Sequence, residues 1–260
     1  MNWYHFLVLG TEPRQQYLAQ FLKEAGHVVM TAEEYLPGYH DAVLLPVPQT
    51  AFYLEKIFEK LQKGQVIYGC NFPPELVIKG EQRDIRFVDY MKREGVASKN
   101  AVATAEGAIA EAIRESKVNL QGSRILVAGY GRCGEVLAEK LAVMHGMVTV
   151  MDRKEEKRTS AMAMGHRGIS FEQGKEEMGQ YDFIFNTVPA PVITVEFLSR
   201  TKPGVTIIDI ASKPGGVDFT YCQKEGICAK LCLGLPGKYA PKSSAGILME
   251  VIEETLWGEK

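Results

Sequence analysis

The chain has 260 residues and a mass of 28.9 kDa, a length that suits one large domain or two small ones. Apolar residues make up 46% of it and charged residues 24%, ordinary globular values that exclude a disordered chain, a collagen-like chain and a coiled coil. The formal net charge of -2 argues against a dedicated nucleic-acid binder. No apolar run approaches the roughly 18 residues that a membrane-spanning helix requires.

The amino terminus and the cysteines predict a cytoplasmic protein. The opening segment MNWYHFLVLGTEPR has no basic region before its apolar run, so we expect no signal peptide. An odd number of cysteines, 5, without an export signal indicates reduced thiols. Cys222, Cys228 and Cys232 lack C-x-x-C spacing and a nearby histidine, so no metal site is expected.

The first hundred residues alternate short apolar segments with amphipathic ones. Strands are predicted at 5–10, 27–30, 41–46 and 65–69, and helices at 13–25 and 51–63. Continuous apolar strands that alternate with helices indicate a parallel sheet covered on both faces. Residues 71–100 contain Pro73-Pro74 and short charge-rich segments, and they show no clear pattern.

A second series of strands and helices begins after residue 104. Thr104 is a plausible N-cap for a helix at 105–117. Strands are predicted at 124–129, 148–152, 182–187, 205–210 and 228–234, and a last helix at 243–256. The two helices flank the second series, so both are candidates for bridging two lobes.

We therefore predict an α/β protein with two Rossmann-like lobes, each a doubly wound parallel sheet, and bridging helices. Residues 1–100, together with a terminal helix at 242–260, are expected to form a flavodoxin-like substrate domain. Residues 101–241 are expected to form the dinucleotide-binding domain, with the binding site in a cleft between the lobes.

One motif points to a nucleotide. The residues Gly129-Tyr130-Gly131-Arg132-Cys133-Gly134 match G-x-G-x-x-G between a predicted strand and a helix. Gly129 permits the tight turn, Gly131 lets the backbone approach a pyrophosphate, and Gly134 lets the helix pack close to the strand. The free N–H groups at the helix start favour the phosphates. The alternative is a strand–helix turn without a ligand, and Cys133 can simply pack within it.

The choice between NAD and NADP depends on a second segment. Asp152 ends the next predicted strand, where a carboxylate accepts a hydrogen bond from the ribose 2′-hydroxyl of NAD. Arg153 and Lys154 follow, then Lys157 and Arg158, and such cations can hold the 2′-phosphate of NADP. They can equally be the solvated start of a helix. We expect NADP, with NAD as the alternative.

From residue 100 onward the sequence resembles the dipicolinate synthase A-subunit family. The matching segments are NAVATAEGAIAEAI (100–113), GSRILVAGYGRCG (122–134), NTVPAPVI (186–193), IIDIASKPGGVDF (207–219) and GLPGKYAPKSSAGIL (234–248). Asp152 departs from the family pattern, which has a small residue before the arginine. More distantly, the layout resembles the D-2-hydroxyacid dehydrogenases.

The resemblance implies an activity and partners. The family oxidises dihydrodipicolinate to pyridine-2,6-dicarboxylate during sporulation, using a nicotinamide cofactor and working beside a flavoprotein-like B subunit. We thus expect an NAD(P)-dependent oxidoreductase with a small dicarboxylate substrate. Relatives of this scaffold often pair, so a homo-oligomer is expected. Dihydrodipicolinate and its hydrated precursor both remain possible substrates.

Two other functions stay open. One is a different small-acid dehydrogenase on the same scaffold. A D-2-hydroxyacid dehydrogenase needs a histidine as acid/base near its carboxyl end. No histidine follows His166 in this chain, which counts against a dehydrogenase of that type. The other is a non-catalytic subunit that binds cofactor and a partner.

The loops that follow predicted strands supply further cofactor candidates, because ligands of open α/β sheets bind beyond the carboxyl ends of the strands. These candidates are Thr187, Val188, Pro189, Asp209, Ala211, Ser212, Leu235 and Pro236.

A dihydropyridine dicarboxylate needs cations for its carboxylates and a base for the proton that leaves with the hydride. Arg14, Lys213 and Lys242 are the candidate cations, and the helix opening at Ser243 offers N–H groups. Glu106, next to Thr104 and expected in a first helical turn, is the candidate base. Each has a structural alternative. Glu106 can merely complement the helix dipole, Ser243 can be an N-cap, Arg14 can be solvated, and Lys213 can belong to a turn.

Overall fold

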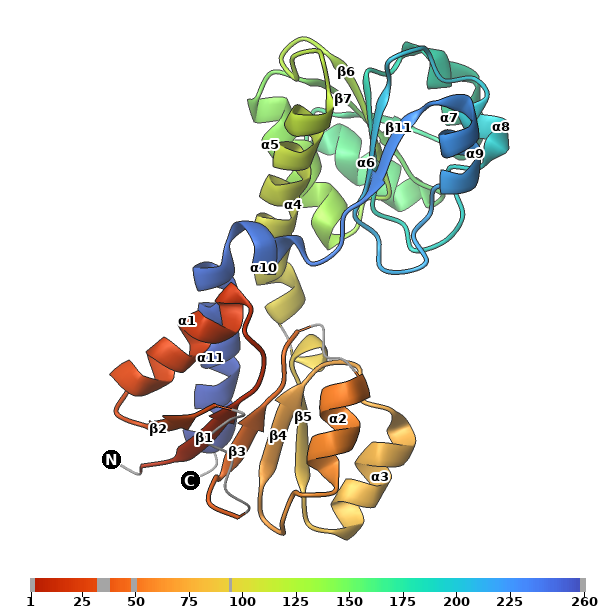
Figure 1. The fold of residues 1–260 in the computed structure, drawn as a ribbon. Helices are drawn as coiled ribbons and strands as arrows, with labels where there is room; N and C mark the ends of the chain where they lie inside the picture. Colours follow the sequence, from red (N-terminus) through yellow and green to blue (C-terminus); the bar gives the residue numbers. More distant parts are fainter. Residues whose placement is uncertain (1–2, 32–37, 48–50, 94, 258–260) are drawn as a thin grey trace. The chain divides into compact units, whose positions relative to one another are not determined.

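The computed structural model describes residues 3–31, 38–47, 51–93 and 95–257, except for the side chains of residues 51–53 and 257. The chain forms two compact units, one of residues 1–100 with 236–260 and the other of residues 101–235 (Figure 1). The return to the first unit therefore comes at residue 236, earlier than the expected 242. Residues 258–260 of the expected terminal segment lie outside the described part.

The first unit contains a parallel five-stranded sheet of order β2-β1-β3-β4-β5 (Figure 1). Its strands are β1 (His5–Val8), β2 (Val28–Met30), β3 (Ala42–Leu44), β4 (Val66–Gly69) and β5 (Arg86–Asp89). Its helices are α1 (Pro13–Glu24), α2 (Ala51–Phe58), α3 (Pro74–Gln82) and α11 (Pro241–Trp257), with the 3₁₀ turn η2 (Tyr90–Lys92). The order 2-1-3-4-5 is that of a flavodoxin-like doubly wound sheet.

Alternation of side chains along the strands gives this sheet two apolar faces. Phe6 of β1 lies in one buried cluster with Leu18 of α1 and Leu248 of α11. Leu7, the next residue, lies in the opposite cluster with Ile57 of α2. Burial on both faces explains why β1, β3 and β4 read as continuous apolar runs.

The segment 71–100 holds α3, β5 and the start of α4 (Val96–Glu115), which sequence patterns did not resolve. The strand β5 is only RFVD, and α3 is rich in charges, so neither has a long apolar stripe. The two nevertheless pack closely, because a Cβ on Gly80 would lie 2.2 Å from Cε2 of Phe87.

The second unit contains a parallel six-stranded sheet of order β11-β10-β9-β6-β7-β8. Its strands are β6 (Arg124–Ala128), β7 (Met147–Met151), β8 (Arg167–Ile169), β9 (Phe183–Asn186), β10 (Thr206–Asp209) and β11 (Cys228–Leu231). Its helices are α5 (Arg132–Val143), α6 (Glu155–Ala163), α7 (Phe171–Glu177), α8 (Val195–Leu198) and α9 (Phe219–Glu225), with η3 (Met178–Gln180). Counted from β6, this is the 3-2-1-4-5-6 order of dinucleotide-binding sheets. Two parallel α/β sheets confirm the predicted fold class.

Two helix starts differ from the sequence prediction. The helix α4 (Val96–Glu115) begins well before Thr104, which is therefore no N-cap, and Glu106 lies outside the first turn. Alanines before Thr104 favour helix and extend it backward. The helix α11 begins at Pro241, a residue suited to a first helical position, so Ser243 lies inside the first turn.

The two candidate bridging helices also differ from each other. The helix α4 runs through the boundary between residues 100 and 101, whereas α11 lies wholly within the first unit. The short α10 (Leu235–Tyr239) contains the second boundary. Within the described ranges, no helix is both long and apolar enough to cross a membrane.

Candidate functional site

The glycine turn between β6 and α5 has a geometry in which each glycine can be accounted for. Gly129 has a φ of +90°, and a Cβ there would lie 2.5 Å from Thr187 Oγ1. A Cβ on Gly134 would lie 2.1 Å from the carbonyl oxygen of Gly129, so only glycine lets α5 approach the strand this closely. A Cβ on Gly131 would have nothing within 4 Å. The turn is therefore closed on its strand side and open at Gly131.

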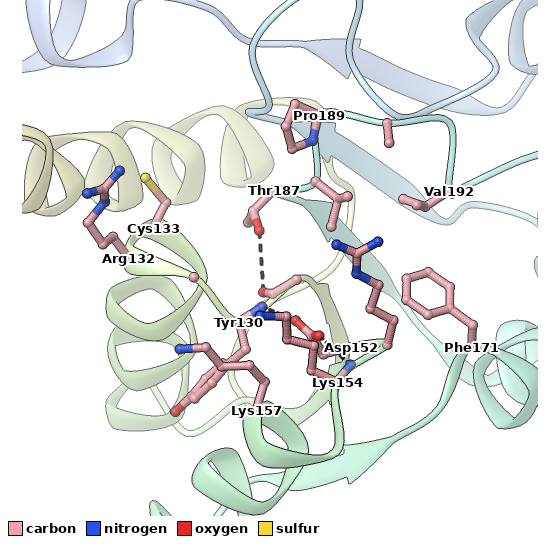
Figure 2. Close-up of a pocket in the computed structure, with 15 residues that line it drawn as sticks. Tyr130, Arg132, Cys133, Asp152, Lys154, Lys157, Phe171, Thr187, Pro189 and Val192 are labelled. Atoms are coloured by element: carbon pink, nitrogen blue, oxygen red, sulfur yellow. Dashed lines mark hydrogen bonds between the residues drawn. The ribbon is translucent and has the colours of Figure 1, made fainter. Parts of the chain in front are cut away.

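A pocket of about 560 Å³ lies over this turn, entirely within the second unit (Figure 2). Eleven of its lining residues were cofactor candidates: Gly129, Tyr130, Gly131, Arg132, Cys133, Asp152, Arg153, Lys154, Thr187, Val188 and Pro189. Sequence reasoning missed Phe171, Ala190 and Val192 as cofactor contacts. Phe171 directly follows the β8 loop, and the strand-end rule would have selected it had the three-residue β8 been recognised.

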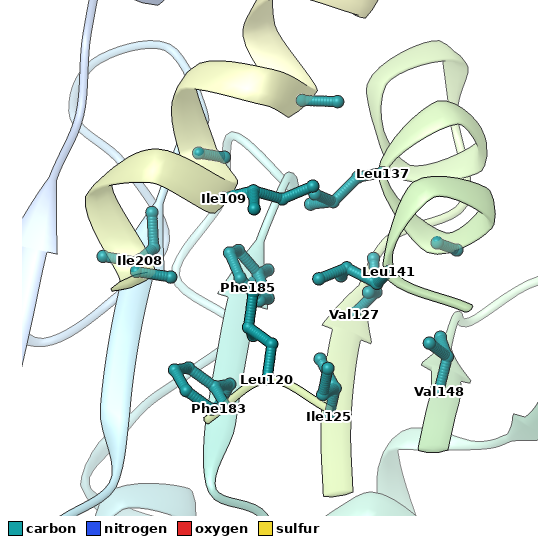
Figure 3. Packing of buried hydrophobic residues seen from close by; sticks show 14 of the residues in the cluster. Ile109, Leu120, Ile125, Val127, Leu137, Leu141, Val148, Phe183, Phe185 and Ile208 are labelled. Carbon is teal, nitrogen blue, oxygen red and sulfur yellow. The ribbon is translucent and has the colours of Figure 1, made fainter. Parts of the chain in front are cut away.

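The turn is held by one well-packed core (Figure 3). Ile125 and Val127 of β6 and Phe185 of β9 are fully buried, and Leu137 and Leu141 of α5 pack against them. Because both ends of the glycine turn are anchored in this core, the N-terminus of α5 has a fixed position beside the pocket.

Asp152 occupies the end of β7 with its carboxylate held by backbone. Its Oδ2 accepts from the N–H of Tyr130 at 2.9 Å, and its Oδ1 accepts from the N–H of Lys154 at 2.9 Å (Figure 2). The residue is half-buried and lines the pocket. These two bonds fix an anionic acceptor at the place where a Rossmann sheet meets the adenosine ribose.

The cations that follow Asp152 have different partners. Arg158 donates to the backbone oxygens of Asp152 and Arg153, at 3.0 Å each. Lys157 donates to Glu135 at 2.9 Å, a hydrogen bond that raises the pKa of the lysine. Lys154 lies 3.8 Å from Glu156. Among the described residues, none pairs with the exposed guanidinium of Arg153.

A buried polar cross-link joins the loops after β9 and β10. Asp209 Oδ1 accepts from Asn186 Nδ2 at 2.8 Å and from the N–H of Ala211 at 2.9 Å, and Oδ2 accepts from the N–H of Gly216 at 2.7 Å. Asn186 and Asp209 are both 0% exposed. A Cβ on Gly216 would lie 2.5 Å from the oxygen of Ala190, so the Lys-Pro-Gly-Gly sequence brings the two loops into contact.

The remaining cofactor candidates lie away from the pocket lining. Asp209, Ala211 and Leu235 are buried; the first two serve the cross-link, and Leu235 belongs to the core. Ser212 is exposed, and Pro236 belongs to the first unit. These residues were predicted to contact the cofactor, but they do not line the pocket. A position at the end of a strand does not by itself fix where a side chain points.

Within the pocket, Cys133 is half-buried in the first turn of α5. Burial raises the pKa of its thiol, against the opposing charge of Arg132. The thiol is therefore a neutral group at neutral pH.

The candidate substrate residues divide between the two units. Thr104, Glu106 and Lys213 belong to the second unit, and Arg14 and Ser243 to the first. Glu106 is exposed on α4 and accepts from Lys140 Nζ at 3.0 Å, whereas Thr104 is half-buried in the middle of α4. Lys213 and Ser243 are both exposed.

Arg14 differs from the other candidates because it is only 6% exposed. It lies at the start of α1, and its Nη1 donates to Ser244 Oγ of α11 at 3.1 Å. Burial lowers the pKa of this guanidinium, although Glu12 opposes the effect. The structural alternative, a solvated Arg14, is therefore wrong, whereas its role as a substrate-binding cation stays a prediction.

Comparison with known proteins agrees with this geometry. A family model, the NAD-binding domain of D-isomer specific 2-hydroxyacid dehydrogenases, matches residues 91–214. The A subunit of dipicolinate synthase from Bacillus subtilis is 34% identical over 171 residues, which cover 66% of this chain and 58% of that protein. The matched part thus spans little more than half of that relative.

Two crystal structures extend the similarity to the whole fold. The A subunit of dipicolinate synthase from Bacillus halodurans has a TM-score of 0.86 at 29% identity, covering 98% of both chains. The A chain of the Bacillus subtilis enzyme has a TM-score of 0.83 at 27% identity, covering 98% of this chain and 96% of that one. The resemblance seen in the sequence is confirmed, and residues 91–214, most of which lie in the second unit, match an NAD-binding domain of the dehydrogenase type.

Proposed function

We propose that this oxidoreductase-type protein, similar in sequence and fold to the A subunit of dipicolinate synthase, oxidises dihydrodipicolinate to dipicolinate with a pyridine nucleotide. The observation that carries the proposal is the open pocket over Gly131, at the carboxyl end of β6 and the N-terminus of α5. A pyrophosphate fits there because no side chain fills the space and free helix N–H groups point to it.

The pocket residues fit a dinucleotide in type as well as position. Phe171, Val188 and Val192 supply an apolar wall suited to an adenine ring, and Asp152 supplies an acceptor for ribose. When bound, the nicotinamide supplies the hydride acceptor. The chain's own contribution is to hold the nucleotide in one orientation and to exclude water from the apolar wall.

We infer further that NAD is the preferred nucleotide, although the basic run after Asp152 had favoured NADP. Three of its four cations already have partners: Arg158 donates to backbone oxygens, Lys157 donates to Glu135, and Lys154 lies 3.8 Å from Glu156. The Asp152 carboxylate is held in place by two backbone N–H groups, and a 2′-phosphate would meet it as a like charge.

Titration of NADH and NADPH into the protein, followed by ligand fluorescence, tests this preference. We expect Asp152→Ala to weaken NADH binding about tenfold or more, since a hydrogen bond to a charged group contributes about 1.5–3 kcal/mol. The same variant should bind NADPH more tightly. Lys224→Ala is the matched control and should leave NADH binding nearly unchanged, because Lys224 is an exposed residue of the same unit that does not line the pocket. Tighter NADPH than NADH binding by the unaltered protein would refute the preference.

For the chemical step, we propose that Glu106 accepts the ring proton while Lys213 attracts a substrate carboxylate. Lys140 Nζ donates to Glu106 Oε1 at 3.0 Å, a hydrogen bond that orients the carboxylate. Thr104, two residues before it on α4, remains in the proposal as a polar neighbour of the substrate, and the role of Ser243, in the first unit, stays a prediction.

The activity is tested by the appearance of reduced-cofactor absorbance when dihydrodipicolinate, or its hydrated precursor, is added with NAD+ or NADP+. Because the relatives are named as subunits, we propose that a second, flavoprotein-like protein is the partner, and the assay includes it. Glu106→Gln and Lys213→Ala should each lower turnover, whereas Lys117→Ala, also in the second unit, should not. No reduced cofactor under any of these conditions contradicts the proposed reaction.

A non-catalytic role predicts a different result in the same assay. The chain would still bind nucleotide and capture the partner, but Glu106→Gln and Lys213→Ala would leave the turnover of the pair unchanged.

A further inference from the structure

The first unit gathers polar side chains at one edge of its sheet. Arg14 follows β1, Cys70 follows β4 and Tyr90 follows β5, so all three stand at the carboxyl ends of parallel strands. All three are buried, with exposures of 6%, 3% and 0%. They are close enough for Cys70 and Tyr90 to affect the pKa of Arg14 electrostatically. This edge is where open α/β sheets bind ligands.

The guanidinium of Arg14 has fewer partners than a buried charge requires. Among the described residues, its one hydrogen bond goes to Ser244 Oγ at 3.1 Å, and its Nε has no hydrogen-bond partner there. Across the described ranges, no carboxylate oxygen approaches the guanidinium within 4.0 Å. A buried arginine normally has a carboxylate or phosphate to compensate its desolvation. The missing partner is therefore an anion.

Ser244 holds the guanidinium of Arg14 without neutralising its charge. It is 0% exposed, and its Oγ lies 3.5 Å from Asn100 Oδ1, to which it donates while accepting from Arg14. Since serine is neutral, it positions the guanidinium without neutralising it.

Tyr90 adds a second unused donor. Its hydroxyl is buried and has no hydrogen-bond partner in the part of the chain that the structure describes, and burial raises the pKa of the phenol well above its usual value of 10.0. The group is thus a neutral O–H donor at every physiological pH. An unpaired buried donor is costly, so a ligand oxygen would stabilise this edge.

Glu12 is the nearest competitor for Arg14. Its Oε1 is buried and accepts no hydrogen bond from any described residue, and its charge raises the pKa of Arg14, yet it forms no ion pair with the guanidinium. Either Glu12 turns onto Arg14 in solution or an external anion takes that place, and the experiment below separates the two.

We propose that Arg14, Ser244 and Tyr90 form a binding site for one carboxylate of a small organic acid. The inference of a carboxylate site rests on the geometry of these residues and does not depend on the proposed function. The identity of the acid as a pyridine dicarboxylate does rest on the proposed function. A planar carboxylate matches the fork of a guanidinium and has a spare lone pair for the phenol. The first turn of α11, which contains Lys242 and Ser243, contributes partial positive charge on the same side as Ser244.

The test measures binding and stability separately, with pyridine-2,6-dicarboxylate as the probe and calorimetric titration as the readout. We expect Arg14→Met to weaken binding more than tenfold and Tyr90→Phe to weaken it severalfold. Pyridine, which has no carboxylate, should not bind. Arg83→Met is the matched control, because Arg83 is a partly buried arginine of the same unit that donates to the backbone oxygens of Phe58 and Leu61. Its binding of the probe should equal that of the unaltered protein.

The melting temperature of the ligand-free protein supplies a second readout. Removing an uncompensated buried charge should leave it unchanged or raise it in Arg14→Met, whereas Arg83→Met should lower it. If Glu12 is the true partner, Arg14→Met and Glu12→Gln both lower the melting temperature while the probe still binds, and the proposal is wrong. If Arg14→Met does not fold, the comparison of Ser244→Ala and Tyr90→Phe with Arg83→Met decides by the same binding criterion.

Nucleotide titration keeps this proposal distinct from the proposed function. All first-unit variants should bind NADH like the unaltered protein. If the unaltered protein does not bind NADH, the proposed function alone is contradicted. If Arg14→Met binds pyridine-2,6-dicarboxylate as tightly as the unaltered protein does, only the carboxylate site is contradicted.

Discussion

The two units begin with the same strand–glycine turn–helix arrangement, but the turns differ in what they can bind. In both, the first strand ends in a glycine of positive φ, +96° at Gly10 and +90° at Gly129, and a helix follows. The second unit then places Gly131 and Gly134 at the next two positions of the motif. The first unit has Glu12 and Gln15 at the corresponding positions.

These substitutions change what each turn can hold. Gly134 brings α5 against the strand, whereas Gln15 is 1% exposed and its Nε2 donates to the oxygen of Leu9 at 2.7 Å. Gly131 leaves open space, whereas Glu12 and Arg14 place charged side chains on the turn of the first unit. The fold thus permits a nucleotide in either unit, and the second and third motif positions decide which turn can take one.

The strongest test of this comparison replaces the two glycines separately. Gly131 has an ordinary extended φ of -91° and free space, so Gly131→Ala should fold normally but bind NADH about a hundredfold more weakly, because the methyl group blocks the pyrophosphate. Gly134→Ala should lose binding and also about 1–3 kcal/mol of unfolding free energy, because its Cβ collides with backbone.

The matched control for both is Gly246→Ala in α11, where a Cβ meets nothing within 4 Å. It should stabilise the protein slightly, since alanine favours helix over glycine by up to about 1 kcal/mol. Thermal melting and fluorescence titration measure the three variants. If Gly131→Ala binds NADH normally, the open space at Gly131 is not what lets the second unit bind a nucleotide.

A second test compares the buried polar groups that tie strand ends together in each unit. Asp209→Ala should cost about 3 kcal/mol or more, because Asn186 and two backbone N–H groups lose a charged acceptor. Gln15→Ala should cost about 1–2 kcal/mol, because its bonds to backbone oxygens are neutral. Urea unfolding gives both values. Equal costs would show that the charge of Asp209 adds nothing to the cross-link.

The smallest expected effect concerns pH. Burial lowers the pKa of His27 in the first unit and of His166 in the second below the usual 6.5. The unfolded chain therefore binds more protons once the pH falls below about 6.5, so stability present above that pH is lost on acidification. His166→Gln should flatten this loss when urea unfolding is compared at about pH 7.5 and about pH 5.5. An unchanged slope would show that His166 does not contribute to it.

Much of the architecture could be predicted from local sequence. Strands β1, β3, β4, β6, β9 and β10 are buried on both faces, and a continuous apolar run is a strong signal. Strands β5 (RFVD) and β8 (RGI) are short and contain charged residues, so their sequences lack that signal. The start of α4 was misplaced because Thr104 has the side chain of an N-cap but stands among good helix formers.

The candidate site also contains some residues that the sequence predicted and others that only the structure revealed. The glycine spacing predicted the turn, and Asp152 and Thr187 were found from strand ends. Phe171 was missed because it begins α7 just after β8, a three-residue strand that the sequence pattern did not reveal. Val192 was missed because it lies six residues beyond the end of β9. Asp209 was placed at the correct strand end, but its partner Asn186 comes from a neighbouring strand, and only the sheet order brings the two together.

The sequence by itself determined two parallel α/β sheets and one open glycine turn, because periodicity and backbone sterics are local properties. Tertiary structure alone decided that Asp209 is a cross-link, that Arg14 is buried and that Ser244 is its partner across a separation of 230 residues. Burial and pairing depend on which distant segments meet, and the free energy of a charge depends on them more than on the residue itself.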